Sequence, residues 1–273
     1  MMANSVSTWV KRHSLVTYFI LAYAITWAVQ IPLALKAQNL IQAPIPFSIH
    51  YLAGYGPMLS AIIVTWLTGG VGGLSELFGR ILKWRVQPVW WLAAISPLAL
   101  YMIVAFILRL IQGEPIGLNM LGQVEFLPDI GFGALFLWLL TYGIGEETGW
   151  RGFALPRLQK NRSALFATFI LWVFWAFWHL PAFFYLYDPA IVIGFLLGIL
   201  AGAIVFSWLY NSTGGSVLMV VLFHGVFNFT TGCTACKAGM ISAIISTLIM
   251  VWAVIVIILF KPTNLSRAEK HVI

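Results

Sequence analysis

The stretch GFGALFLWLLTYGIGEETGWRGFAL, residues 131–155, determines what kind of fold this chain adopts. It is mostly apolar, and a bilayer core about 30 Å thick needs about 20 such residues at a rise of 1.5 Å each. Glu146 and Glu147 nevertheless stand side by side within it. An ionisable group at this depth costs about 2.5–3.5 kcal/mol on insertion scales, so the two acids predict a functional site inside the membrane.

The composition of the whole chain is that of an integral membrane protein. Of its 273 residues, 61% are hydrophobic and only 8% are charged, against roughly 25% charged in a soluble domain. This excludes soluble, disordered, fibrous and disulfide-scaffold classes. The net charge of +7 would suggest nucleic acid as a partner of a soluble protein. Here basic cytoplasmic loops explain it, so the expected partner is the lipid bilayer and no nucleic acid.

Apolar stretches long enough to span the bilayer recur along the chain, and we predict an all-α polytopic membrane helix bundle with about eight transmembrane helices. A cytoplasmic N-terminal segment (1–13) precedes a single transmembrane domain (14–260), and a cytoplasmic tail (261–273) follows it. The predicted spans are 14–35, 50–69, 88–111, 131–155, 163–186, 189–210, 215–232 and 239–260.

The distribution of basic residues predicts the orientation. With the N-terminus inside, 12 of the 15 Lys and Arg residues lie on the inner side, and only Lys36, Arg109 and Lys237 lie outside. The positive-inside rule therefore predicts that both termini are cytoplasmic, and we expect the plasma membrane of a bacterium. Residues 74–83 alternate apolar and polar faces, which predicts a cytoplasmic interfacial helix that anchors the bundle or docks substrate. The acids expected in outer loops are Glu114, Glu125, Asp129 and Asp188.

Three further polar residues fall inside predicted spans. His179 lies in W-A-F-W-H-L-P (175–181), and His224 and Asn228 lie in F-H-G-V-F-N (223–228). Glu146 and His179 are both about 25 Å along their helices from the hairpin tip at 161–162, and the other two lie roughly 16–22 Å from the next cytoplasmic tip. A lone transmembrane histidine is often only a packing residue. Similar depth nevertheless predicts that all four line one cavity, entered from the cytoplasmic side.

Spacing within the helices suggests roles for these side chains. His224 and Asn228 are four residues apart, so both face the same way and both can donate to one oxygen atom, as in an oxyanion hole. Glu147 and Arg151 are also four apart in the favourable order for an ion pair. Glu146 has no such helical partner, which makes it the candidate general base. Pro181 predicts a bend just after His179.

Three motifs in order carry a family resemblance: E-E-x-x-x-R at 146–151, W-x-x-x-H at 175–179 and H-x-x-x-N at 224–228. In this the chain resembles the CPBP family of intramembrane proteases, which comprises type II CAAX prenyl endopeptidases and bacteriocin-processing or immunity (Abi) proteins. The motifs span about a third of the chain. One departure is visible, because the second motif is commonly F-x-x-x-H and position 175 is Trp.

The resemblance implies an enzyme that hydrolyses a peptide bond of a membrane-associated, and in some members prenylated, peptide or protein. Carried over, Glu146 and His179 activate water, His224 and Asn228 stabilise the oxyanion, and Glu147 with Arg151 supports them. The family is also described as metalloproteases. Two His and one Glu form a known zinc set, so zinc could be held by Glu146, His179 and His224. The sequence lacks H-E-x-x-H, and we favour a mechanism without a cofactor.

Other interpretations of the same residues stay open. His179 and His224 could be axial haem ligands, although this leaves the Glu pair and Asn228 unexplained. The adjacent acids could form the relay of a proton-coupled transporter, for which inverted repeats would be expected and none is evident. The chain could also act by binding, as a non-catalytic immunity protein of the same family. Cys233 and Cys236 form one C-x-x-C, too little for a zinc site or a disulfide framework, so a redox role is not expected.

Overall fold

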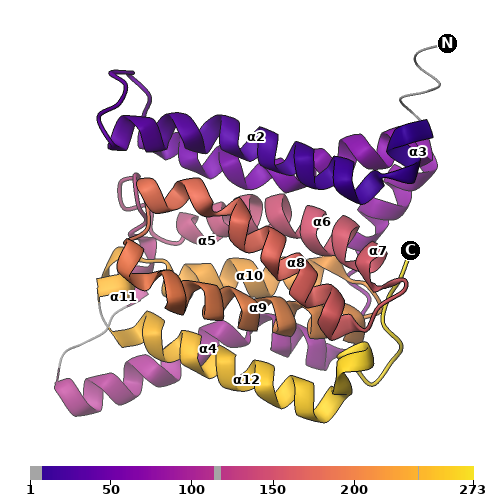
Figure 1. The fold of residues 1–273 in the computed structure, drawn as a ribbon. Coiled ribbons are helices and arrows are strands. Elements are labelled where there is room, and N and C mark those ends of the chain that lie inside the picture. Colours follow the sequence, from indigo (N-terminus) through magenta and orange to yellow (C-terminus); the bar gives the residue numbers. More distant parts are fainter. Residues whose placement is uncertain (1–7, 114–117, 239) are drawn as a thin grey trace.

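The computed structural model describes residues 8–113, 118–238 and 240–273. Every secondary-structure element in these ranges is a helix, which confirms the predicted all-α fold (Figure 1). Three parts of the sequence predictions lie outside the described residues: residues 1–7 of the N-terminal segment, Glu114 of an outer loop, and residue 239, which opens the predicted eighth span.

Within the described ranges, six helical segments are long and apolar enough to cross a membrane, so the chain is an integral membrane protein. Each coincides with a stretch that its hydropathy predicted. They are α2 (Ser14–Ala37), η1 (Phe47–Tyr55) running into α3 (Gly56–Ile81), α4 (Pro88–Gln112), α8 (Ala164–Trp178) with η5 (Leu180–Phe184), η6 (Pro189–Ile191) with α9 (Val192–Ser212), and α12 (Met240–Asn264).

The other two predicted spans are helical but differ from regular long helices. The seventh is α10 (Val217–Thr231), which has 15 residues. The fourth is a succession of short α-helical and π-helical pieces: α5 (Gly133–Trp138), the π-helix η3 (Leu139–Glu146), α6 (Glu147–Gly149), the π-helix η4 (Trp150–Ala154) and α7 (Leu155–Gln159). A π-turn widens the helix by one residue per turn, and hydropathy averages cannot detect it. The prediction of one uniform fourth span was therefore wrong in its local geometry.

A kink at Gly70 divides α3 into two parts. Gly70 has φ 58° and ψ −150°, a backbone conformation that residues with a Cβ rarely adopt. The second part contains the predicted amphipathic helix 74–83. Its Leu77 and Ile81 are buried against the bundle, while Phe78 is exposed. Arg80 also donates to the carbonyl of Gly152, 3.1 Å away, so this segment is fastened to the broken fourth span. Its position at a leaflet surface stays a prediction.

The helices are arranged in layers (Figure 1). α2 and α3 pack together on one side of the bundle, and α4 and α12 lie on the other. The broken fourth span, α8, α9 and α10 lie between them, and α10 packs against both η3 and α4. The start of α2 and the C-terminus lie at the same end of the molecule.

The C-terminal tail folds back onto this end. The backbone N–H of His271 donates to Asn211 Oδ1 (3.2 Å), and its carbonyl accepts from Gln159 Nε2 (2.9 Å). Burial, and then the nearby Arg80 and Lys83, lowers the pKa of His271. The tail is therefore held by partly buried hydrogen bonds to Gln159 of α7 and Asn211 of α9, which also bond to each other.

Two glycines let the neighbouring layer approach the broken fourth span. A Cβ on Gly145 would lie 2.6 Å from the carbonyl oxygen of Gly54, and one on Gly149 would lie 2.5 Å from the Tyr18 hydroxyl and 2.6 Å from Pro57. Contacts this short leave no room for a methyl group. Both positions fix the distance between the first layer and the segment that carries Glu146 and Glu147.

We expect Gly145→Ala and Gly149→Ala each to destabilise the protein by about 1–3 kcal/mol, because the added methyl group would push the neighbouring layer away from the broken fourth span. Gly79→Ala is the matched control, since a Cβ there meets nothing within 4 Å and alanine is the better helix former by about 1 kcal/mol. Thermal unfolding of the purified protein in detergent measures the difference. Equal melting temperatures for all three variants would contradict this packing.

Candidate active site

The four predicted catalytic side chains come together at one cavity of about 800 Å³. Glu146 reaches it from the end of η3, His179 from the end of α8, and His224 and Asn228 from α10. Segments far apart in the sequence therefore meet here, as their similar depth predicted. Whether these residues catalyse a reaction stays a prediction.

One part of the cavity wall is formed by residues that the sequence predicted to be on the outer side. The lining includes Glu125, Asp188 and Lys237. Lys237 belongs to α11 (Thr234–Ala238), which lies at the end of the bundle opposite the C-terminus (Figure 1). Lys237 and Glu125 form an exposed ion pair there, with 3.5 Å between nitrogen and oxygen. All three residues belong to the predicted outer side, so the cavity extends toward that side, and the predicted cytoplasmic entrance stays a prediction. The reason is that about 25 Å from a tip, in a core about 30 Å thick, is nearer the opposite face.

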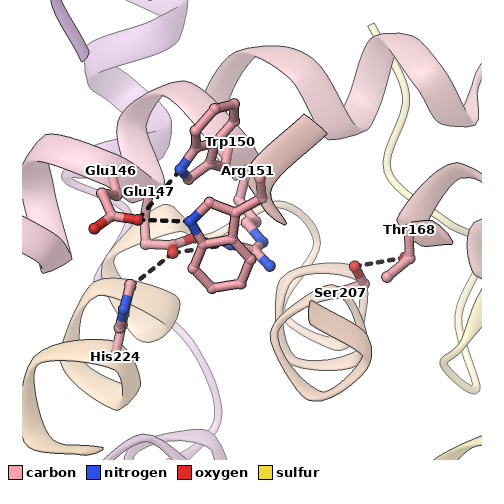
Figure 2. Close-up of polar contacts among 8 residues, drawn as sticks. Glu146, Glu147, Trp150, Arg151, Thr168, Ser207 and His224 are labelled. Atoms are coloured by element: carbon pink, nitrogen blue, oxygen red, sulfur yellow. Dashed lines mark hydrogen bonds and ion pairs between the residues drawn. The ribbon is translucent and has the colours of Figure 1, made fainter. Parts of the chain in front are cut away.

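Glu146 is fixed by two indoles. It is 3% exposed, and its Oε2 accepts from Trp175 Nε1 at 2.8 Å and from Trp150 Nε1 at 3.3 Å (Figure 2). No side chain in the described ranges hydrogen-bonds to its other oxygen, Oε1. Trp175 stands at the position where this chain departs from the motif F-x-x-x-H, and phenylalanine could not make this bond.

Glu147 is the centre of a fully buried charged network (Figure 2). Arg151 Nη1 donates to both of its oxygens at 2.9 Å, and His224 Nδ1 lies 2.8 Å from Oε1. The guanidinium of Arg151 also lies between two aromatic rings, 4.8 Å from the centroids of both Trp175 and Phe206. The ion pair offsets part of the cost of burying these charges, although Nε and Nη2 of Arg151 are buried without a hydrogen-bond partner among the described residues.

The hydrogen bonds of the two histidines define their ring nitrogens. His179 Nδ1 lies 2.7 Å from the carbonyl oxygen of Trp175, which can only accept, so Nδ1 carries the proton. In the neutral ring Nε2 then keeps its lone pair. His224 Nδ1 faces the Glu147 carboxylate and is protonated for the same reason. Its Nε2 can donate to a ligand only when the ring is an imidazolium.

Local structure explains how His179 reaches the cavity. The α-helix α8 ends at Trp178, and the chain continues as the 3-10 helix η5 with Pro181 in its first turn. Proline lacks the N–H that would continue the α-helical ladder. The predicted change of direction after His179 is thus present as a change of helix type.

The side chains suggested for zinc do not form a metal site in this structure. In the described part of the chain, no group of three or more His, Cys, Asp or Glu residues could hold a metal ion. We therefore derive no chemical step through a metal.

Two polar residues of the cavity wall were missed by the sequence analysis. His50 is 5% exposed; its Nδ1 lies 2.5 Å from the Tyr185 hydroxyl and its Nε2 2.7 Å from that of Tyr142. Gln30, from α2, is 1% exposed and lines the same cavity. Both are strongly polar residues in apolar stretches, and that signal could have indicated them.

Cys233 and Cys236 form a disulfide at the start of α11 (Thr234–Ala238). Both sulfurs belong to buried residues. The C-x-x-C is therefore a local structural link between α10 and α11, close to the cavity-lining Lys237. The sequence analysis expected neither a zinc site nor a disulfide framework and did not predict this bond.

The fold and the site together define a membrane helix bundle with a cluster of buried acidic and basic side chains around an internal cavity. Residues 128–230, which contain all three motifs, match the model of the family described as Type II CAAX prenyl endopeptidase Rce1-like. The chain therefore carries an Rce1-like region, which confirms the resemblance predicted from the motifs.

A curated protein is similar over part of its length. CAAX prenyl protease 2 of Methanococcus maripaludis is 28% identical over 151 residues, which cover 50% of this chain and 55% of that protein. The chain thus spans about half the length of the curated relative that it matches. Both matches are to prenyl endopeptidases.

Replacement of Arg151 tests the charged network. We expect Arg151→Met to destabilise the fold by about 3–5 kcal/mol, because it leaves the buried Glu147 carboxylate without its bidentate partner. Arg109→Met, at an exposed position of α4, is the control and should have little effect. Adding Glu147→Gln to Arg151→Met should recover part of the loss. Unfolding in detergent measures all three, and an Arg151→Met protein as stable as the control would contradict the network.

Proposed function

We propose that this chain is an intramembrane endopeptidase that hydrolyses a peptide bond of a membrane-associated peptide or protein. The observation that carries the proposal is the arrangement of Glu146 and His179 at one cavity with His224 and Asn228, within the Rce1-like region. The mechanism uses water and no cofactor. Non-catalytic binding, as by an immunity protein, is the alternative that the experiment below separates from it.

Glu146 is the general base in this mechanism. Its Oε2 is bound by two indoles, so Oε1 takes a proton from the attacking water. The lone pair on Nε2 of His179 accepts the second hydrogen of that water and aligns it. As the C–N bond breaks, Glu146 passes its proton to the leaving amine nitrogen. The products are a carboxylic acid and an amine, which exchange a proton to give a carboxylate and an ammonium group, and Glu146 returns to its starting carboxylate state.

His224 and Asn228 stabilise the oxyanion of the tetrahedral intermediate. Asn228 donates from its amide, and His224 donates from Nε2 as an imidazolium. The Glu147 carboxylate, 2.8 Å from Nδ1, balances the charge of that ring while it also binds Arg151. The charges of the two carboxylates, Glu146 and Glu147, and of the two cations, Arg151 and the His224 imidazolium, then sum to zero. An oxyanion donor of this kind contributes about 2.7–4 kcal/mol where one has been measured.

Glu146→Gln tests catalysis against binding. It keeps the size of the side chain and its contacts to the indoles but removes the base, so we expect cleavage to fall at least 100-fold, at the lower end of general-base contributions. Proteomics of protein termini in membranes with wild type or Glu146→Gln identifies the substrates as precursors that accumulate in the variant. Glu125→Gln, at the exposed rim, is the control. Identical termini with wild type and Glu146→Gln would favour the binding role.

The orientation of the chain bears on which substrates it meets. If the termini are cytoplasmic, as the positive-inside rule predicts, the cavity opens toward the outer face of the membrane. The Cys233–Cys236 disulfide lies at the same end, and disulfides persist in oxidising compartments. The substrate therefore presents its scissile bond from the outer side.

Cysteine labelling tests this orientation. Asp188→Cys at the cavity mouth and Lys160→Cys at the opposite end both introduce exposed thiols into a chain whose native cysteines are paired. We expect a membrane-impermeant maleimide to label the first variant in intact cells and the second only after lysis. The reverse pattern would contradict an outward-facing cavity, and the chain without substitutions measures the background.

A further inference from the structure

One buried polar side chain of the cavity wall has no role in the mechanism above. Gln30 belongs to α2, outside residues 128–230 that match the family. It is 1% exposed and lines the cavity, and its Oε1 is buried without a hydrogen-bond partner. Its amide nitrogen also makes no hydrogen bond to any residue in the described ranges. A carboxamide has two N–H donors and an acceptor oxygen, so all of this capacity is unused.

Such a group is costly to the fold. An unsatisfied buried polar group destabilises a protein, whereas an apolar side chain of the same shape would be neutral or stabilising. The chain offers a direct contrast in Gln159, which is equally buried. Its amide exchanges hydrogen bonds with Asn211 at 3.1 and 2.8 Å and donates to the His271 carbonyl. Gln159 is thus a satisfied structural glutamine, and Gln30 is not.

Gln30 is positioned close to the proposed catalytic groups. One turn before it, Thr26 accepts a hydrogen bond from Trp178 Nε1 at 2.8 Å and donates to the Ala53 carbonyl at 2.9 Å. Trp178 directly precedes His179, and Ala53 precedes Gly54, against which the segment carrying Glu146 packs. The turn that ends at Gln30 therefore forms the side of the cavity next to both His179 and Glu146.

The neighbouring polar residue on this wall cannot take the same role. His50 has both ring nitrogens engaged by the hydroxyls of Tyr142 and Tyr185. A neutral imidazole has one donor and one acceptor, so both are used. His50 is thus held by its two hydroxyl partners and has no free donor or acceptor for a ligand, unlike Gln30.

We propose that Gln30 binds the main chain of the peptide substrate and so holds the scissile bond against Glu146 and His179. The proposal rests on the proposed endopeptidase function. A carboxamide matches a peptide group because each has an N–H donor and a C=O acceptor in one plane, and two such groups can pair. A hydrocarbon chain has neither and would leave Gln30 unsatisfied. The ligand of this subsite is therefore a peptide backbone, whatever side chains or lipid the substrate carries.

The test combines stability with binding. We expect Gln30→Met to raise the melting temperature, because it removes an unsatisfied buried polar group, and yet to weaken peptide binding about 3- to 10-fold. Gln159→Met is the matched control, with the opposite pattern of lower stability and unchanged binding. Binding is measured in the Glu146→Gln background, so that the peptide stays intact. The probe is a fluorescent peptide ending Cys-Val-Ile-Met, used with and without a farnesyl group on its cysteine.

Replacing single amides of the probe by esters identifies the bond itself. An ester lacks the N–H of the amide that it replaces. At the position that Gln30 binds, the ester should therefore weaken binding of the probe to the protein that retains Gln30 by about 3- to 10-fold. The same ester should make no difference to binding by Gln30→Met. An ester penalty that persists in Gln30→Met, a loss of stability on that substitution, or failure to bind either form of the probe would overturn the proposal. Peptide that is bound through Gln30 but left intact by wild type would overturn the endopeptidase function and leave this subsite standing.

Discussion

The arrangement of this site depends on one buried carboxylate that is bound by an arginine and a histidine. Glu147 is inaccessible to solvent and binds Arg151 from its own helix and His224 from α10. An isolated charge in such surroundings would cost several kcal/mol, and the Arg151 guanidinium offsets it, although Nε and Nη2 of Arg151 have no hydrogen-bond partner in the part of the chain that the structure describes. The broken fourth span and α10 can therefore pack only in the register that brings His224 to Glu147. The same register brings Asn228, one turn further along α10, into the cavity.

The π-turns around this carboxylate separate the two adjacent acids. Neighbouring residues of a helix point about 100° apart, so Glu146 and Glu147 cannot share one environment. Glu147 faces the cations, whereas Glu146 faces two indoles and the cavity. The transition from η3 to α6 falls between them, and η4 begins at Trp150, one of the two indole donors. Irregular helix of this kind is common at functional sites because it redirects side chains that a regular ladder would align.

Much of this could be predicted from the sequence, and the exceptions have physical causes. Hydropathy located every long helix, because burial in lipid demands about 20 apolar residues in a row. Helical spacing and depth located Glu146, His179, His224 and Asn228 at one cavity. The π-turns, the direction in which the cavity extends and the bonds of His50 could not be predicted in this way. Each depends on how separate segments pack, which no single stretch of sequence records.

Trp175 shows how a small departure from a motif alters a site. Its carbonyl fixes His179, its indole N–H binds Glu146, and its ring packs against Arg151 and lies 5.8 Å from His224 in an edge-on contact. A phenylalanine at this position retains the carbonyl and the ring but not the N–H. In this chain the extra donor occupies Oε2 of Glu146, so the proposed mechanism assigns the water to Oε1. A base oriented before the substrate arrives has no reorganisation to undergo during the reaction, and this is the condition under which polar groups accelerate chemistry most.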